Sequence, residues 1–373
     1  MLMNKFFSIL FFVLVFCLGL FHYIRQSEPS INYDRFNLVS PGILRTPDER
    51  FQDLKDYPFK PNYLTIDDTR IHYIDEGPKD GQIIYLLHGE PTWSYLYRKM
   101  IPILVDSGYR VIVPDMVGFG KSDKFLSKND YSYEHHIHTM KELIKQLDLN
   151  EITFFGQDWG GIVGLRVVAE MPDRFSSVAV SNTGLPAAEG INAWLIENIV
   201  KFLVWWFGPV TFDELRTANI EFSNNPDASP FDGAIVFIKW IAHSFYEDDM
   251  DVTGIIQFSG RLDLSDEELR AYNAPYPSGE YKSGAHVFPY LIPTQLSENE
   301  YYWKNVYEKW DKPFLVAYGS DERTTIGFKK DFIDRIPDPI DVTLEGVGHF
   351  CQEEAGEELA ILLDQFIKGE LYK

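Results

Sequence analysis

The chain has few cysteines and few basic residues, and both shortages limit what it can do. Only two cysteines occur among the 373 residues: Cys17 in an apolar N-terminal run and Cys351 near the C-terminus. Their settings differ so much that no disulfide framework is expected. No cluster of Cys and His has the spacing of zinc ligands, so the sequence predicts no metal site. The formal net charge of −22 argues against a basic face, and nucleic acid is therefore a poor candidate partner.

Long apolar runs are also scarce, and only residues 6–24 have membrane character. Their 19 residues approach the roughly 20 needed to cross the hydrocarbon core, with Lys5 before them and Arg25 after them. No small-x-small cleavage pattern follows the run, so we expect residues 1–25 to be an uncleaved signal anchor and the protein to be membrane-bound. The alternative is a cleaved signal peptide and secretion. Residues 26–60 are then expected to be a polar lead-in to the domain.

The rest of the composition suits a packed core. Hydrophobic residues make up 45% of the chain and charged residues 24%, so general disorder is not expected. The length suffices for one large α/β domain with an insertion, or for two ordinary domains.

From about residue 62 the sequence alternates between strands and helices, which is typical of a mainly parallel sheet. Short apolar runs predict strands at residues 63–66, 70–74, 83–87, 110–115, 152–155 and 177–181. Helical spacing predicts a helix over residues 134–147. Three histidines on that helix lie among charged residues and are expected to be solvated: His135, His136 and His138.

The alternation stops for about 110 residues and then resumes. Residues 186–295 are rich in aromatic residues and proline and show no clear strand, so they are predicted to form an inserted helical cap. The resumed pattern predicts strands at 314–318 and 340–344 and a final helix at 357–367. Residues 61–185 and 296–373 are therefore expected to form one α/β core.

A strand followed by the sequence GQDWG, residues 156–160, and then by a helix has the pattern of a nucleophile elbow. Its central residue is Asp158 rather than serine. An aspartate can also be an ordinary helix N-cap, but here it follows an apolar strand and has suitable partners further along the chain. A carboxylate that attacks saturated carbon forms an alkyl ester, which water can cleave at the carbonyl. Asp158 therefore favours displacement of a halide or opening of an epoxide over ester hydrolysis.

Such a mechanism needs a base for the water, and His349 in GVGHF, residues 346–350, is the candidate. It follows the last strand, which agrees with the order nucleophile, acid, histidine. The acid is expected after the strand at 314–318, where Asp321 and Glu322 are adjacent. Either carboxylate could accept the imidazole N–H.

Several motifs resemble the first subfamily of haloalkane dehalogenases, over about residues 42–370. They are HGEPTWSYLYRKM at 88–100, GFGKSD at 118–123, QDWGG at 157–161, YNAPYP at 272–277 and GHFCQE at 348–353. The resemblance implies the α/β-hydrolase fold, with a mostly parallel eight-stranded sheet flanked by helices. It also implies a reaction that needs no cofactor, a small apolar halogenated substrate and a monomer.

The resemblance assigns roles to individual residues. Asp158 would be the nucleophile and His349 the base, and the backbone N–H groups of Glu90 and Trp159 would form the oxyanion hole. The Trp159 indole would be one halide donor. The second donor is a cap tryptophan in the first subfamily, and among Trp194, Trp205, Trp206 and Trp240 the alignment reaches Trp240 without a gap. The second subfamily has an Asn at position 90, where this chain has Glu.

This sequence departs from the family pattern in two places. The family acid is usually Asp, whereas an ungapped alignment places Glu322 at that position and Asp321 one residue early, which favours Glu322. Residues 190–230 resemble an insertion in the cap. They contain the apolar sequence FLVWWF at 202–207, which could belong to the cap core, cover the pocket or rest on a membrane.

Three functions are compared. A haloalkane dehalogenase would use two indole donors for the departing halide. An epoxide hydrolase would share Asp158 and His349 but need cap tyrosines to protonate the epoxide, for which the candidates are Tyr246, Tyr272, Tyr281 and Tyr290. A membrane-anchored binding protein or luciferase-like oxygenase on the same scaffold is the third. The complete catalytic set and Glu90 disfavour it.

Overall fold

The computed structural model describes residues 38–225, 227, 229–260 and 262–371. The predicted anchor at residues 6–24 lies outside the described residues. Residues from Val39 onward form one compact unit. Among the residues that are described, no helix is long and apolar enough to cross a bilayer.

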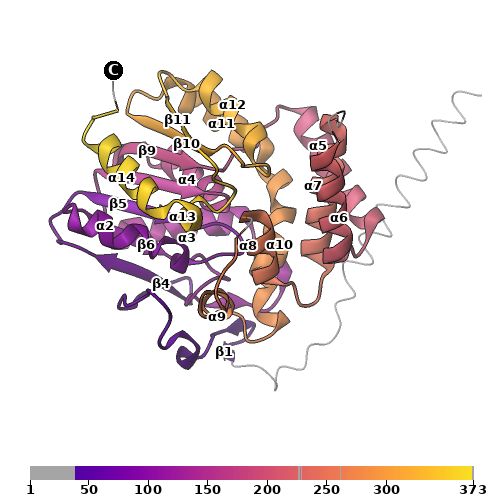
Figure 1. Ribbon diagram of the computed structural model, residues 1–373, viewed down its shortest axis with the longest axis horizontal. Coiled ribbons are helices and arrows are strands. Elements are labelled where there is room, and N and C mark those ends of the chain that lie inside the picture. The colour runs from indigo at the N-terminus through magenta and orange to yellow at the C-terminus, as the bar shows by residue number, and fades with distance from the viewer. Residues whose placement is uncertain (1–37, 226, 228, 261, 372–373) are drawn as a thin grey trace, which may run out of the picture. The chain divides into compact units, whose positions relative to one another are not determined.

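An eight-stranded sheet forms the centre of this unit (Figure 1). In spatial order its strands are β11 (Ile340–Leu344), β10 (Phe314–Gly319), β9 (Phe175–Ser181), β8 (Ile152–Gln157), β5 (Ile83–Leu87), β6 (Arg110–Pro114), β4 (Thr69–Glu76) and β3 (Asn62–Ile66). Neighbouring strands from β11 to β6 are parallel to each other. Strand β4 is antiparallel to both of its neighbours, β6 and β3. All predicted strands are confirmed. The central strand β8 is buried along its whole length, so its apolar run faces protein on both sides of the sheet.

Helices cover both faces of the sheet. They are α2 (Met100–Asp106), α3 (Tyr133–Gln146), α4 (Trp159–Glu170), α11 (Leu296–Asn305), α12 (Ile326–Arg335), α13 (Cys351–Glu354) and α14 (Gly356–Ile367). Helix α14 packs on α2, and α3 packs on α4. Short 3-10 helices occupy several connections: η2 (Asp48–Phe51), η3 (Ser94–Tyr97), η4 (Lys128–Asp130), η5 (Pro172–Arg174), η6 (Gly279–Lys282), η7 (Ile292–Gln295) and η8 (Tyr307–Lys309).

Helix α3 confirms the predicted helix but corrects one expectation about its histidines. Ser132 caps the helix by accepting a hydrogen bond from the His135 backbone N–H. His138 is partly solvated, whereas His136 is fully buried, with its ring edge-on to Phe288 at 4.5 Å between centroids. The prediction that His136 is solvated was wrong because the charged residues around it in sequence lie on other faces of the helix.

The segment before the first long strand belongs to the folded unit. Strands β1 (Leu38–Ser40) and β2 (Ile43–Leu44) form a small sheet with β7 (Lys124–Phe125). The Arg45 guanidinium donates to both carboxylate oxygens of Asp123, at 2.7 and 2.8 Å. The predicted lead-in at 26–60 therefore differs from the structure, because its part from Val39 on packs into the domain.

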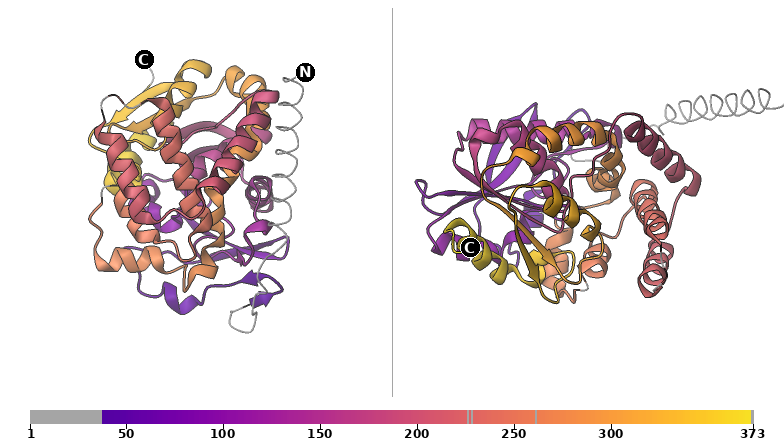
Figure 2. Two further views of the ribbon diagram at one scale, coloured as in Figure 1. Left: turned by 90° about the vertical axis from the view of Figure 1, so that its right-hand side faces the viewer. Right: turned by 90° about the horizontal axis from the view of Figure 1, so that it is seen from above.

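The chain between β9 and β10 is helical. Its helices are α5 (Ile191–Phe207), α6 (Phe212–Asn224), α7 (Pro230–Tyr246), α8 (Val252–Gly260), α9 (Asp266–Asn273) and α10 (Ser283–Leu291). Helices α5, α6 and α7 pack together, and α10 lies between α7 and the sheet (Figures 1 and 2). The shared core of α5, α6 and α7 contains Val204, Val210, Leu215, Ile238, Ile241 and Ala242.

One buried arginine joins three distant segments. Arg98 donates to the Glu353 carboxylate, with Nη2 at 3.0 Å from Oε2, and to Glu268 at 3.1 Å. The Tyr272 hydroxyl donates to the same Glu353 at 2.5 Å. Because Glu353 lies in the short helix α13, which follows the loop after β11, these contacts tie that loop to η3 and to α9.

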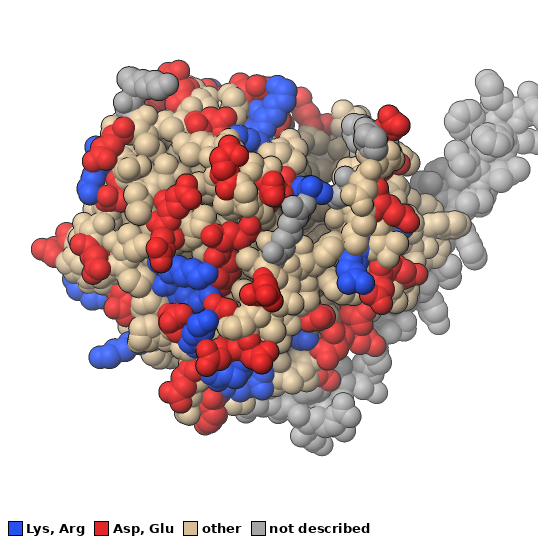
Figure 3. Space-filling model, viewed as in Figure 1, with Lys and Arg blue, Asp and Glu red and all other residues tan. Residues whose placement is uncertain are grey.

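Acidic side chains dominate the charged surface. On the face drawn in Figure 3, Asp and Glu are spread over the core and the cap, with Lys and Arg interspersed among them. Such a surface repels polyanions over most of its area.

Candidate active site

Asp158 occupies the sharp turn between β8 and α4. Its backbone has φ 51° and ψ −129°, a conformation that costs a non-glycine residue about 1–3 kcal/mol. The turn is held by hydrogen bonds from the Asp158 N–H to the Asn182 carbonyl at 3.0 Å and from the Thr183 hydroxyl to the Asp158 carbonyl at 2.6 Å. A side chain at Gly160 would collide with the Leu87 carbonyl. The flanking glycine is thus required because α4 approaches β5 closely.

The loop after β5 brings a backbone donor to Asp158. The Glu90 N–H donates to Asp158 Oδ1 at 2.8 Å. His88 fixes this loop, since its Nε2 accepts the Met116 N–H at 3.1 Å and its Nδ1 therefore carries the proton that it donates to the Gly89 carbonyl at 2.9 Å. His88, the first residue of the motif at 88–100, thus has a structural role in this loop.

His349 lies between two carboxylates. Its Nδ1 donates to Glu322 Oε2 at 2.8 Å, and its Nε2 lies 3.5 Å from Asp158 Oδ2. The Glu322 side chain is fully buried, and its other oxygen, Oε1, accepts the backbone N–H of Thr325 at 2.6 Å. The neighbouring Asp321 is exposed. Of the two candidate acids, the structure brings Glu322 to the histidine.

Two amides hold the histidine loop, and sequence reasoning gave neither a role. Asn182 Nδ2 donates to the carbonyls of Gly348 at 2.7 Å and His349 at 3.0 Å, and Gln157 Nε2 donates to the His349 carbonyl at 3.1 Å. Gln157 is part of the elbow motif. The one sequence signal for Asn182 is its place directly after β9, the strand beside β8.

Charge controls the protonation of the pair. Burial lowers the pKa of His349. The charges of Glu322 and Asp158, and the hydrogen bonds to both, outweigh this effect and raise the pKa to about 10. Burial raises the pKa of Glu322, and the facing His349 then lowers it below its usual value. The raised pKa favours the imidazolium form of His349 at neutral pH, and removing the facing Asp158 charge makes this imidazolium more acidic.

The likeness to known proteins agrees with this geometry. The family model described as alpha/beta hydrolase fold matches residues 82–356. A haloalkane dehalogenase from Psychrobacter cryohalolentis is 41% identical over 338 residues, which are 87% of this chain and 98% of that protein. One from Mycolicibacterium paratuberculosis is 36% identical over 330 residues, 85% of this chain and 96% of that protein. This chain belongs to the haloalkane dehalogenase family.

A solved relative supports the same assignment. The structure described as the tetrameric haloalkane dehalogenase from Paraglaciecola agarilytica has a TM-score of 0.68 and 32% identity, and it covers 86% of this chain and 97% of its own. The dehalogenase described here therefore has the same architecture as the Paraglaciecola agarilytica protein over nearly the whole length of that protein.

In this dehalogenase, the Trp159 ring is buried beside Asp158. It packs edge-on against Tyr133, with ring centroids 5.7 Å apart. It also packs against Phe288 of α10, with ring centroids 4.5 Å apart. Trp240 is half-buried on α7, where it packs against the shared core of α5, α6 and α7. Within the described part of the chain, no ring contact joins Trp240 to Trp159.

Two buried tryptophans outside the site, Trp93 and Trp303, use their indole N–H groups within the protein, whereas that of buried Trp310 has no partner among the described residues. Trp93 donates to the Ala271 carbonyl at 3.2 Å, and Trp303 donates to the Leu185 carbonyl at 2.9 Å. Among the described residues, neither Trp159 nor Trp240 has an acceptor for its indole N–H. Both donors are available to a ligand.

The Glu90 side chain is buried at the same site. Burial and the Asp158 charge raise its pKa well above the usual value for a glutamate. Its Oε1 accepts no hydrogen bond from any residue that the structure describes. Burial and the Asp158 charge thus favour the neutral form of the Glu90 carboxyl group.

The tyrosines considered for epoxide chemistry have other surroundings. Tyr272 uses its hydroxyl on Glu353, and Tyr246 packs edge-on against Phe245 with ring centroids 5.2 Å apart. Tyr290 packs against the same Phe245 at 4.5 Å, and Tyr281 is buried in η6. In the described part of the chain, the contacts of Tyr246 and Tyr272 are with groups other than Asp158.

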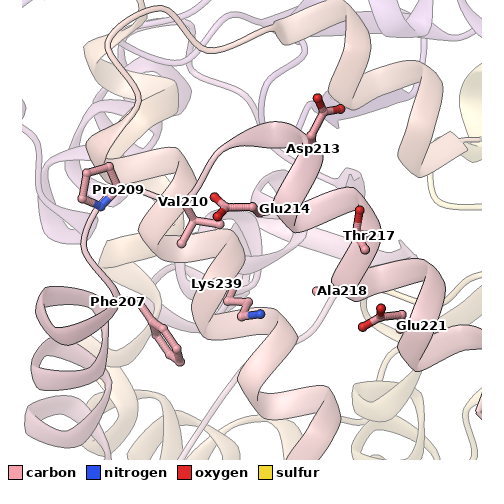
Figure 4. A pocket seen from close by; sticks show the side chains of 9 residues that line it. All are labelled: Phe207, Pro209, Val210, Asp213, Glu214, Thr217, Ala218, Glu221 and Lys239. Carbon is pink, nitrogen blue, oxygen red and sulfur yellow. The ribbon is translucent and has the colours of Figure 1, made fainter.

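A cavity of about 440 Å³ lies in the cap, away from the catalytic residues (Figure 4). It is lined by Phe207, Pro209, Val210, Asp213, Glu214, Thr217, Ala218, Glu221 and Lys239. None of these is a predicted site residue, so this cavity is not the candidate active site. Over the described ranges, no group of three His, Cys, Asp or Glu could hold a metal ion.

Proposed function

We propose that this enzyme converts small apolar haloalkanes and water into an alcohol, a halide ion and a proton, through an ester on Asp158. The observation that carries the proposal is the arrangement of one carboxylate. Asp158 Oδ1 accepts the Glu90 N–H, while Oδ2 faces His349 Nε2. A carboxylate with one oxygen fixed presents the other as the nucleophile.

In the first step, Asp158 Oδ2 attacks the carbon that bears the halogen. The new C–O bond forms as the C–X bond breaks, and the bonding pair leaves with the halide. The substrate is neutral, so the strained elbow serves to present the carboxylate with little reorganisation. Oδ1 becomes the ester carbonyl oxygen.

In the second step, water attacks the ester carbonyl carbon. Loss of the Asp158 charge removes a cause of the raised His349 pKa, so the imidazolium releases its proton and Nε2 can then accept one from water. Glu322 stabilises the imidazolium that forms again. The oxyanion develops on Oδ1, where the backbone N–H groups of Glu90 and Trp159 would stabilise it. Collapse breaks the bond between the carbonyl carbon and the alkyl oxygen, which takes the proton from His349 and leaves as the alcohol. The carboxylic acid then gives its proton to His349, which restores the carboxylate and the imidazolium.

For the departing halide we propose the indole N–H groups of Trp159 and Trp240, which would make this a member of the first, cap-tryptophan subfamily. Support comes from the lack of protein acceptors for both groups and from Glu90, which occupies the position of the Asn donor in the second subfamily. Indole donors bind a weakly hydrated anion without neutralising Asp158. Closing α7 toward the core on substrate binding would bring Trp240 to the site.

The test is halide release from a panel of short bromoalkanes. The wild-type enzyme should release bromide and alcohol in equal amounts, and Asp158→Ala should release none. No bromide from the wild type, or undiminished bromide from the variant, would refute the proposal. Diol formation from styrene oxide at a comparable rate would instead favour an epoxide hydrolase.

We further propose that residues 6–24 anchor the enzyme in a membrane. The support is their length of 19 residues and their lack of charge through residue 21. Sedimentation of the full chain with the membrane fraction after a carbonate wash supports anchoring. Recovery in the soluble fraction, with the N-terminal residues absent by mass spectrometry, points to cleavage and secretion.

A further inference from the structure

Helix α5 has an apolar face that no other helix or strand among the described residues covers. Six side chains of this face are exposed: Ile191, Trp194, Leu195, Ile199, Phe202 and Trp206. At 100° per residue, they fall within an arc of about 140°. Ile191 and Trp206 are 67% and 68% exposed, so the face continues from the first turn of the helix to the last.

The opposite face of α5 already supplies the cap core. Ala193 and Val204 are buried there, and Val204 belongs to the cluster that α5 shares with α6 and α7. The outward face is therefore not needed for cap packing. A helix that is apolar on both sides is normally buried or in contact with a membrane. An exposed apolar patch of this length marks an interaction surface.

The face is also electrically neutral. Glu197 and Lys201 are the charged residues of α5, and they form an ion pair with each other. In a chain of net charge −22, a surface without net charge avoids repulsion by anionic lipid. Trp194, Phe202 and Trp206 are aromatic, and tryptophan is favoured at the boundary between hydrocarbon and water.

We propose that this face of α5 rests on a lipid bilayer, with its aromatic and aliphatic side chains in the interfacial region. The chain itself favours this occupant. Residues 6–24 are apolar, and the 13 residues 25–37 that join them to the described part span at most about 45 Å. That length is about the diameter of a domain of this size. If residues 6–24 are anchored, the bilayer is the apolar phase that α5 meets at the highest effective concentration.

The inference has a consequence for substrate supply. Haloalkanes are apolar and partition into lipid. A cap helix that lies in the interface places the enzyme where such a substrate is most concentrated. This consequence rests on the proposed dehalogenation, whereas the contact with lipid rests on the proposed anchor at residues 6–24 and on the exposed face of α5.

The experiment uses the full-length chain in phosphatidylcholine vesicles that contain a diazirine-bearing phosphatidylcholine. After illumination, labelled peptides are mapped by mass spectrometry. Label within residues 191–207, on the six exposed side chains and unchanged by salt, supports the proposal, because a neutral face binds by apolar burial. Label at 6–24 with none at 191–207 overturns it and leaves the anchor intact.

Variants make the test specific. Ile199→Asp with Trp206→Glu should reduce labelling of 191–207 roughly tenfold, since both charges would enter the interface. Ile361→Asp is the matched control: Ile361 is 50% exposed, close to the 53% of Ile199, and lies on α14, away from the cap (Figure 1). It should leave the labelling unchanged. Release of bromide from a water-soluble bromoalkane should be the same in all three proteins.

A second copy of the chain is the competing occupant. Protein–protein crosslinks between α5 helices, with a dimer mass that the double variant abolishes, would overturn the lipid proposal. Crosslinks from residues 6–24 to α5 would overturn it as well, because the N-terminal segment would then cover the face.

Discussion

Glu322 Oε2 lies 2.8 Å from His349 Nδ1, and the carboxylate that makes this contact has no exposure to solvent. Its backbone partners at Thr324 and Thr325 fix the other oxygen, Oε1. The carboxylate is thus oriented before substrate arrives. It sets the tautomer of His349 and leaves Nε2 directed at Asp158.

Glu322→Gln should therefore lower kcat by about 10³- to 10⁴-fold, as loss of the buried acid does in serine hydrolases. The amide keeps the shape but not the charge that stabilises the imidazolium. The measurement is the steady-state rate of bromide release. Asp321→Asn is the control and should stay within about twofold of the wild type, since Asp321 is exposed. The reverse pattern would assign the acid to Asp321.

The high pKa of His349 predicts a pH dependence of stability. Its pKa is raised in the folded state to about 10 from an ordinary 6.5, so the stabilisation is fully present below about pH 6.5 and is lost as the pH rises through 10. The difference in unfolding free energy between wild type and His349→Gln should accordingly shrink from pH 6 to pH 10. Urea denaturation at both values measures it. If this difference in unfolding free energy does not change with pH, the carboxylates of Asp158 and Glu322 do not stabilise the His349 imidazolium in the folded state.

Trp159→Phe should weaken halide binding and turnover while leaving the fold intact. The phenyl ring retains packing on Tyr133 and Phe288, but the N–H donor is gone. Loss of one hydrogen bond to a charged group predicts a reduction of about 10- to 150-fold in kcat/KM for bromoalkanes. Bromide quenching of tryptophan fluorescence gives an independent measure of binding. Trp206→Phe, an exposed position on α5, should change neither quantity, and an unaffected Trp159→Phe enzyme would exclude the indole as a donor.

Arg98→Met should destabilise the domain by about 3 kcal/mol, because buried Glu353 loses both guanidinium contacts and keeps only the Lys99 ammonium, at 2.8 Å from Oε2. Chemical denaturation measures the loss. Lys145→Met removes the cation of an exposed pair with Glu142 and should cost no more than about 0.5 kcal/mol. Equal effects in the two variants would contradict the view that Arg98 joins the His349 loop to the cap.

Sequence reasoning predicted the sheet well, because strands buried on both faces are continuous apolar runs that few other elements imitate. It also singled out Asp158 and His349, whose side chains lie 3.5 Å apart in the structure, since each lies in a loop whose glycines and preceding strand have a recognisable spacing. The choice between Asp321 and Glu322 depended on which of the two adjacent side chains the backbone turns toward His349. Two neighbouring carboxylates in a sequence do not indicate this. The alignment favoured Glu322, and the structure places that residue against the histidine.

Other features required the tertiary structure. The burial of His136 follows from contact with Phe288, which is 152 positions away in the chain. The amide of Asn182 acts on a loop 166 residues further on. The packing of residues 39–60 depends on partners such as Asp123, which no local pattern near residue 45 indicates. The halide role of Trp240 remains a prediction, because the contacts of Trp240 in the described residues are with the cap core and His243 rather than with Trp159.

The central claim is that Asp158 is alkylated and that water then attacks its carbonyl carbon. A single turnover in H₂¹⁸O with enzyme in excess over a bromoalkane tests it most directly. If the ester forms and is cleaved as proposed, the alcohol takes its oxygen from Asp158 and contains none of the heavy isotope. The peptide with Asp158 then gains one ¹⁸O. An alcohol labelled in the first turnover, with an unlabelled Asp158 peptide, would mean that water attacks the substrate directly and would contradict the mechanism.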